Sequence, residues 1–146
     1  MGLIKAFFFL PSKKEFLNDF SANEHLQAQA ANLWRQLDEI SLILLIVTAI
    51  LSFVPAIYYY MGFCNSPGRH YQPKYWAMFF LGSVVACFFI PLALEYGLIK
   101  QQIKGVFDLY ACCASNCALY GLIAFLLASF IMCNIGKNNA YKIFKL

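Results

Sequence analysis

The side chains that could do chemistry within the apolar part of this chain are mainly cysteines. Cys112, Cys113 and Cys117 lie close together, and grouped thiolates can bind a metal. A tetrahedral thiolate site needs a fourth ligand, however, and neither His25 nor His70 is near in sequence. We therefore expect no metal site and interpret the cysteines as small buried residues, with palmitoylation or a disulfide as the alternative.

Glu95 is the one carboxylate well inside an apolar run. Ionisable residues at membrane depth are costly to bury and are often functional. Because Glu95 lies near the end of its run, close to Tyr96 and Lys100, solvation at the interface would also explain it. Two interpretations stay open: an interfacial carboxylate, or an intramembrane polar site that forms an intersubunit pair or binds a proton or ion.

A third group follows a Ser-Pro-Gly turn at positions 66–68 and consists of Arg69, His70 and Lys74. We expect this loop to face lipid headgroups, with recognition of an anion or a partner as the alternative.

The sequence contains no arrangement of residues typical of an enzyme active site. The sequence offers no paired nucleophile and base, no carboxylate pair and no phosphate-binding glycine loop. Nucleic-acid binding would need a clustered basic stripe, which the sequence lacks. We predict a non-enzyme without a cofactor and without a nucleic-acid partner.

Composition indicates the elements that must position these residues. Of 146 residues, 62% are hydrophobic and 12% are charged, whereas soluble domains are about half apolar and about a quarter charged. The chain is thus predicted to be an integral, multi-pass membrane protein, in a membrane that the sequence does not identify. Five of the seven acidic residues lie in positions 1–39, which separates a polar N-terminal segment (1–39) from a transmembrane domain (40–146).

Three apolar runs are long enough to cross a bilayer. They span 40–62, 75–99 and about 109–135. The 23 residues of the first run would extend ~34 Å as a helix, against a hydrocarbon core of ~30 Å. Because these runs do not alternate as barrel strands do, we predict an all-α protein with three transmembrane helices.

The N-terminal segment contains two helix-start signals. Ser12 with Glu15, and Ser21 with Glu24, both match the capping-box pattern. They predict a short helix over about 13–20 and a longer one from Ala22. No Gly or Pro occurs from Ala22 to Val54, so the longer helix is expected to continue into the first span.

The longer helix carries an apolar seam with alternating spacings of four and three, beside which Trp34 lies. The seam residues are Leu26, Ala30, Leu33, Leu37, Ile40 and Leu44. Two alternatives are equally favoured: the seam packs on the short helix of its own chain, or it packs against another copy or a partner. A helix exposed to solvent or lying on the lipid surface is the third alternative.

Small residues at helical spacing mark faces where helix backbones can approach closely in lipid. Gly82 and Ala86 form one such pair, Ala114 and Ala118 another, and Gly121 extends the second face. Together with Leu26, Leu33, Trp34 and Leu37, these are our candidate interface residues.

The predicted function is that of a non-enzymatic, oligomeric membrane subunit, an anchor or scaffold of a larger assembly. A small three-span protein has little interior, so its expected partners are the lipid bilayer and either other copies or an obligate membrane complex. The alternative is a small oligomeric channel or a membrane-disrupting effector.

Overall fold

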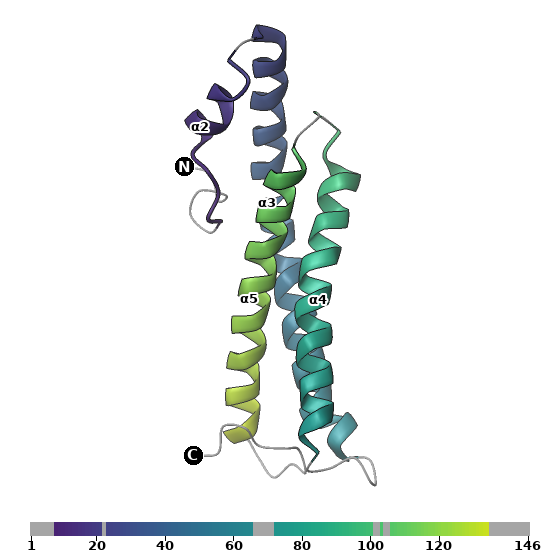
Figure 1. Cartoon of the computed structure of the whole chain (residues 1–146). Helices are drawn as coiled ribbons and strands as arrows, with labels where there is room; N and C mark the ends of the chain where they lie inside the picture. The colour runs from purple at the N-terminus through teal and green to yellow at the C-terminus, as the bar shows by residue number, and fades with distance from the viewer. Residues whose placement is uncertain (1–7, 22, 66–71, 101–102, 104–105, 135–146) are drawn as a thin grey trace.

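The computed structural model describes residues 8–21, 23–65, 72–100, 103 and 106–134. Over this part of the chain it contains helices and no strand. The elements are α2 (Lys13–Asn18), α3 (Glu24–Met61), the short 3-10 helix η1 (Phe63–Asn65), α4 (Pro73–Leu98) and α5 (Phe107–Asn134). Figure 1 shows α3, α4 and α5 side by side, with α2 against the end of α3 that extends beyond the other two helices.

Three helices are long and apolar enough to cross a membrane, which confirms the predicted architecture. They contain 38, 26 and 28 residues for α3, α4 and α5, or ~57, ~39 and ~42 Å of helix. By length and composition, the chain is therefore a multi-pass membrane protein. The excess length of α3 is its N-terminal part, which continues without a break into the span, as predicted.

The start of α3 differs from the prediction. Asn23, rather than Ser21, is the N-cap: its side-chain oxygen accepts from the backbone N–H groups of His25 at 3.0 Å and Leu26 at 3.5 Å. The second predicted capping box is therefore wrong. Asn caps a helix as well as Ser does, so Asn23 can take over the cap nearer to the helix. Ala22, the predicted first residue, is outside the described residues.

The first predicted capping box is confirmed. The Ser12 backbone N–H donates to the Glu15 carboxylate at 2.8 Å, and the Glu15 N–H donates to the Ser12 hydroxyl at 3.2 Å. The resulting helix, α2, ends at Asn18, somewhat earlier than expected. Phe16 is its buried residue, with its ring 5.5 Å from that of Trp34 on α3.

Each pair of long helices is in contact, so the bundle is triangular in section. Polar bonds join the helices as well: Ser83 of α4 donates to the Leu51 carbonyl of α3 at 2.7 Å, and the Trp76 indole donates to Ser129 of α5 at 3.3 Å. At the opposite end from α2, Tyr59 and Tyr60 form a buried aromatic cluster with neighbouring rings. The bundle is thus held at both ends and along its length.

Candidate functional site

The inward faces of the three long helices are lined by small and polar residues. Steps of four, seven and eight residues place them on one stripe of each helix. They are Ser41, Thr48 and Ser52 on α3, Ser83, Cys87 and Glu95 on α4, and Cys113, Cys117 and Gly121 on α5.

On α3 this stripe continues the predicted seam with polar instead of apolar residues. Ser41, Thr48 and Ser52 are the serine and threonine residues of the first apolar run, and all are buried. Apolar periodicity alone missed them, because it assigned the position to Ile40, which is only half-buried. The signal that could have found them is their own spacing of seven and four. Ser52 satisfies its hydroxyl within the helix, by donating to the Thr48 carbonyl at 2.7 Å.

Glu95 lies within this interior, near the end of α4, and its exposed fraction is 0%. The Cys113 thiol and the Tyr110 ring of α5 face its carboxyl group. Among the described groups, neither Glu95 oxygen has a hydrogen-bond partner, and the same holds for the Tyr110 hydroxyl. Buried polar atoms without partners cost free energy, and three of those in the described residues gather here, the two Glu95 oxygens and the Tyr110 hydroxyl.

This burial corrects the first interpretation of Glu95. The chain encloses the carboxyl, which therefore is not solvated at the interface. Its described neighbours come from α5 of the same chain. The intramembrane polar site at Glu95 stays a prediction, with the Cys113 thiol and the Tyr110 phenol as the neighbouring groups of α5.

The six cysteines all fall within the described residues, and none forms a disulfide. Five are buried and Cys112 is half-buried. Cys87 packs with its sulfur 3.4 Å from the Ser52 hydroxyl, which shows the tight fit of these side chains between helices. Within the described part of the chain, no three His, Cys, Asp or Glu side chains are placed to hold a metal ion.

The predicted seam lies inside the subunit. Leu33 and Leu37 are fully buried and Trp34 is 8% exposed, in a cluster that includes Phe8 and Phe16 of the N-terminal segment. In the structure, Leu33, Trp34 and Leu37 therefore pack within their own chain. Leu26, at the far end of the seam, is 38% exposed.

The small residues divide into an inner and an outer group. Ala114 and Gly121 are buried; a Cβ placed on Gly121 would lie 2.6 Å from the Cys87 sulfur. Ala118 is half-buried. Gly82 faces outward, and a Cβ there would meet nothing within 4 Å. Gly82 and Ala86 line an open apolar groove between α3 and α4, so the outer pair is the one available to another helix.

Of the predicted loop site, Arg69 and His70 are outside the described residues. Lys74 lies in the first turn of α4, exposed, with its ammonium group 5.0 Å from the centre of the Tyr75 ring. Such a cation–π contact at the end of a span is compatible with the headgroup level.

An unpredicted contact fixes the segment before α2. Asn116 of α5 accepts from the Phe9 backbone N–H at 3.2 Å, and the Cys112 thiol donates to the Phe9 carbonyl at 3.5 Å. Non-helical backbone near a membrane needs such partners. The sequence signal that could have predicted this contact is the amide side chain of Asn116, directly before the apolar stretch 117–133. The contact holds Phe8 and Phe9 against α5 and thereby closes one side of a space next to α3.

Searches against protein-family models, curated proteins and solved structures find no match to this chain.

Proposed function

We propose that this protein is a non-enzymatic membrane subunit that pairs with a second copy of itself through α4, and that serves as an anchor or scaffold of a membrane assembly. The observation that carries the proposal is the outward-facing Gly82–Ala86 groove. The long N-terminal part of α3, with α2 packed on it, is the portion that such an anchor presents outside the apolar layer.

The groove has the form that helix pairing in lipid requires. It encloses about 390 Å³ and is lined by Leu51, Pro55, Met78, Phe79, Gly82, Ser83 and Ala86. Lipid tails are as apolar as the groove, so burial alone does not favour a protein helix there. Close backbone approach at small residues supplies the packing that favours a helix over lipid.

A second copy of the chain is the occupant that this face suits best. A two-fold axis through the crossing of two α4 helices would bring Gly82 and Ala86 of one copy against the same residues of the other. α4 is also the helix least used within the subunit: 17% of its apolar window is buried, against 28% in α3 and 39% in α5. Its outer face is therefore free to pack against another chain.

The experiment compares Gly82→Leu with Gly97→Leu by energy transfer between labelled chains in liposomes. Both glycines lie on α4, and a Cβ on either meets nothing within 4 Å, so neither change should disturb the subunit itself. Leucine at position 82 would overfill the crossing at a cost of about 1–3 kcal/mol, which is roughly a fivefold to hundredfold loss of association. Gly97→Leu should associate as the unchanged chain does.

Equal association of the three proteins would contradict pairing through this groove. A Gly82→Leu chain that loses a different, co-purifying protein but keeps its own oligomeric state would instead assign the groove to that partner. Ion flux through the same liposomes tests the channel alternative. Because the groove face is apolar, pairing of this kind is expected to give no conductance.

A further inference from the structure

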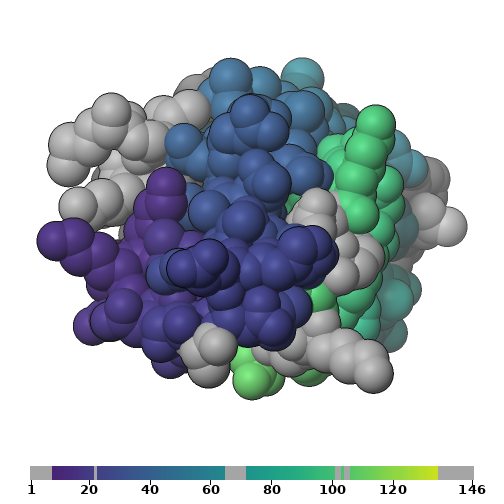
Figure 2. Space-filling model, turned by 90° about the horizontal axis from the view of Figure 1, so that it is seen from above, coloured from purple at the N-terminus to yellow at the C-terminus, as the bar shows by residue number. Residues whose placement is uncertain are grey.

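A second hollow lies between α3 and the N-terminal segment. Its volume is about 1120 Å³, and its walls come from residues 8–14, Leu17 of α2, and Trp34, Arg35 and Asp38 of α3. Figure 2, viewed onto this end of the molecule, shows the N-terminal segment and α2 lying beside α3. The size is in the range of small-molecule and lipid sites rather than of packing defects.

The cavity lies at the level where the chain leaves the apolar layer. On α3, Asp38 comes just before Ile40, the first residue of the uncharged run. On α5, Asn116, which holds Phe9, comes directly before the apolar stretch 117–133. The apolar wall at Phe8–Leu10 therefore meets the acyl region, and the charged wall lies towards the headgroups.

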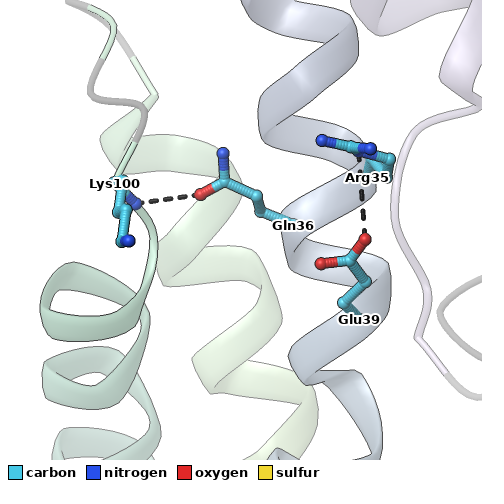
Figure 3. Close-up of polar contacts among 4 residues, drawn as sticks. All are labelled: Arg35, Gln36, Glu39 and Lys100. Atoms are coloured by element: carbon cyan, nitrogen blue, oxygen red, sulfur yellow. Dashed lines mark hydrogen bonds and ion pairs between the residues drawn. The ribbon is translucent and has the colours of Figure 1, made fainter.

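The charged wall is predominantly cationic. Lys13, Lys14 and Arg35 line the cavity with a single carboxylate, that of Asp38. Figure 3 shows the Arg35 side chain on the side of α3 away from Gln36, which instead reaches the Lys100 backbone N–H at 2.9 Å. The Arg35–Glu39 ion pair is 3.9 Å long with both side chains about two-thirds exposed (69% and 65%), so it binds the guanidinium only weakly.

We propose that this cavity binds one anionic phospholipid, whose phosphate lies among Lys13, Lys14 and Arg35 and whose acyl chain packs along Phe8–Leu10, Leu17 and Trp34. Cationic groups near a bilayer surface favour anionic over zwitterionic lipids, and a guanidinium suits a phosphate geometrically. The apolar wall explains why the ligand is a lipid rather than a free anion. The site is separate from the α4 groove and does not depend on the proposed function.

The chain provides its own probe, because it contains two tryptophans and Trp34 is the one that lines the cavity. In the full-length Trp76→Phe protein, fluorescence therefore reports Trp34 alone. The protein is placed in phosphatidylcholine vesicles that contain either brominated phosphatidylglycerol or brominated phosphatidylcholine, whose bromine atoms quench on contact. We expect the brominated anionic lipid to quench Trp34 at concentrations at which the zwitterionic one does not.

Lys13→Gln with Lys14→Gln should weaken this quenching by roughly tenfold or more, at ~1 kcal/mol for each charge. Both side chains are exposed in the first turn of α2, where a positive charge opposes the helix dipole, so the change does not weaken the helix. Lys74→Gln, at the other end of the bundle, is the matched control, and its Trp34 should be quenched as in the protein with Lys74. Unchanged helicity by circular dichroism excludes unfolding as the cause.

Three outcomes would overturn the proposal. Equal quenching by both lipids would show an unselective contact with the bilayer. Quenching that persists in the double lysine variant would show that the lipid does not bind through the cationic wall. No quenching would mean that other groups, the chain's own included, fill the cavity. Inorganic phosphate at millimolar concentration is expected not to relieve the quenching; relief would show that the site takes a free anion instead of a lipid.

Discussion

At Gly121, α5 packs closely against both other spans. A Cβ on it would lie 2.6 Å from the sulfur and 2.8 Å from the Cβ of Cys87, and 3.2 Å from the Ser52 hydroxyl oxygen. Gly121→Ala should therefore push α5 away from α4 and lower the free energy of unfolding by about 1–3 kcal/mol. Thermal or denaturant unfolding in mild detergent, followed by circular dichroism, measures the change.

The control for Gly121→Ala is Gly97→Ala, at an exposed position of α4 with nothing within 4 Å of the added carbon. There the better helix propensity of alanine should leave stability equal or slightly higher. Adding Cys87→Gly to Gly121→Ala removes both close atoms of Cys87 and should recover part of the loss. A Gly121→Ala protein as stable as the Gly97→Ala protein would show that α4 and α5 are less tightly packed here.

Glu95 gives the second residue-scale prediction. It is enclosed at 0% exposure, without a hydrogen-bond partner for its oxygens among the described groups. Glu95→Gln keeps the shape and carries no charge, so stability should change by less than about 1 kcal/mol. Glu95→Lys places a longer cationic side chain in the same space and should cost about 3 kcal/mol or more. Equal unfolding midpoints for the two variants would contradict the buried position of the carboxyl.

At the scale of elements, composition and capping patterns predicted most of what the structure contains. Three apolar runs became three spans, and Ser12 with Glu15 became the start of α2, because these features are local in the chain. The start of α3 was predicted wrongly at Ser21. Asn23 and Ser21 are nearly equal as N-caps, so the choice between them depends on how the chain turns back from α2, which no local pattern records.

Which side of each helix points into the bundle was less predictable. Gly82 and Gly121 look alike in sequence, yet Gly82 lies on the outer groove and Gly121 lies in a close internal contact with Cys87 and Ser52. The rotation of a helix about its axis is set by packing with both neighbours at once, and small residues fit inside as well as outside. The packing of the seam at Leu33 and Leu37 was ambiguous for the same reason. Phe8 and Phe16, which share its buried cluster, are far from it in the sequence, and only the folded structure brings them together.

The capping box of α2 predicts a pH dependence. The Ser12 backbone N–H, and then its hydroxyl, bind the Glu15 carboxylate and lower the pKa of Glu15 below its ordinary value. The bond therefore stabilises α2 above the ordinary pKa of Glu15, and this stabilisation is lost as the pH falls through the lowered pKa. Trp34 fluorescence in the Trp76→Phe protein should report loosening of Phe16 in acid, below about pH 4.

Glu15→Gln is the control for this titration. Glutamine can still accept from the Ser12 N–H but does not titrate, so the acid-side change in Trp34 fluorescence should disappear. An identical transition in both proteins would assign it to another group.

For the whole molecule, the two ends of α3 have different roles. Its span packs with α4 and α5, while its N-terminal part packs with Phe8, Phe16 and the rest of residues 8–21; we call that part, with residues 8–21, the N-terminal lobe. The lobe carries the cationic cavity, and the Gly82–Ala86 groove lies between the spans of α3 and α4. Because different residues form the two features, damage to one should leave the other intact.

That separation is tested with Leu33→Glu and Leu37→Glu together, compared with Leu26→Glu. The first two positions are fully buried beneath the N-terminal segment, so each change should cost at least about 3 kcal/mol through lost packing and a buried charge. Leu26 is 38% exposed on the same seam, and its replacement should be tolerated. Trypsin, which cuts after Lys13, Lys14 and Arg35, should cleave the double variant much faster.

The double variant should nevertheless reach the membrane fraction and pair as the unchanged chain does. The apolar spans that drive insertion and the α4 groove are untouched by the two changes. Loss of pairing together with lobe unfolding would show that the lobe supports the assembly, and that its seam, rather than the α4 groove, connects the copies. Gly82→Leu gives the reciprocal measurement: pairing should fall while the lobe stays resistant to trypsin, because the groove contains no residue of the lobe.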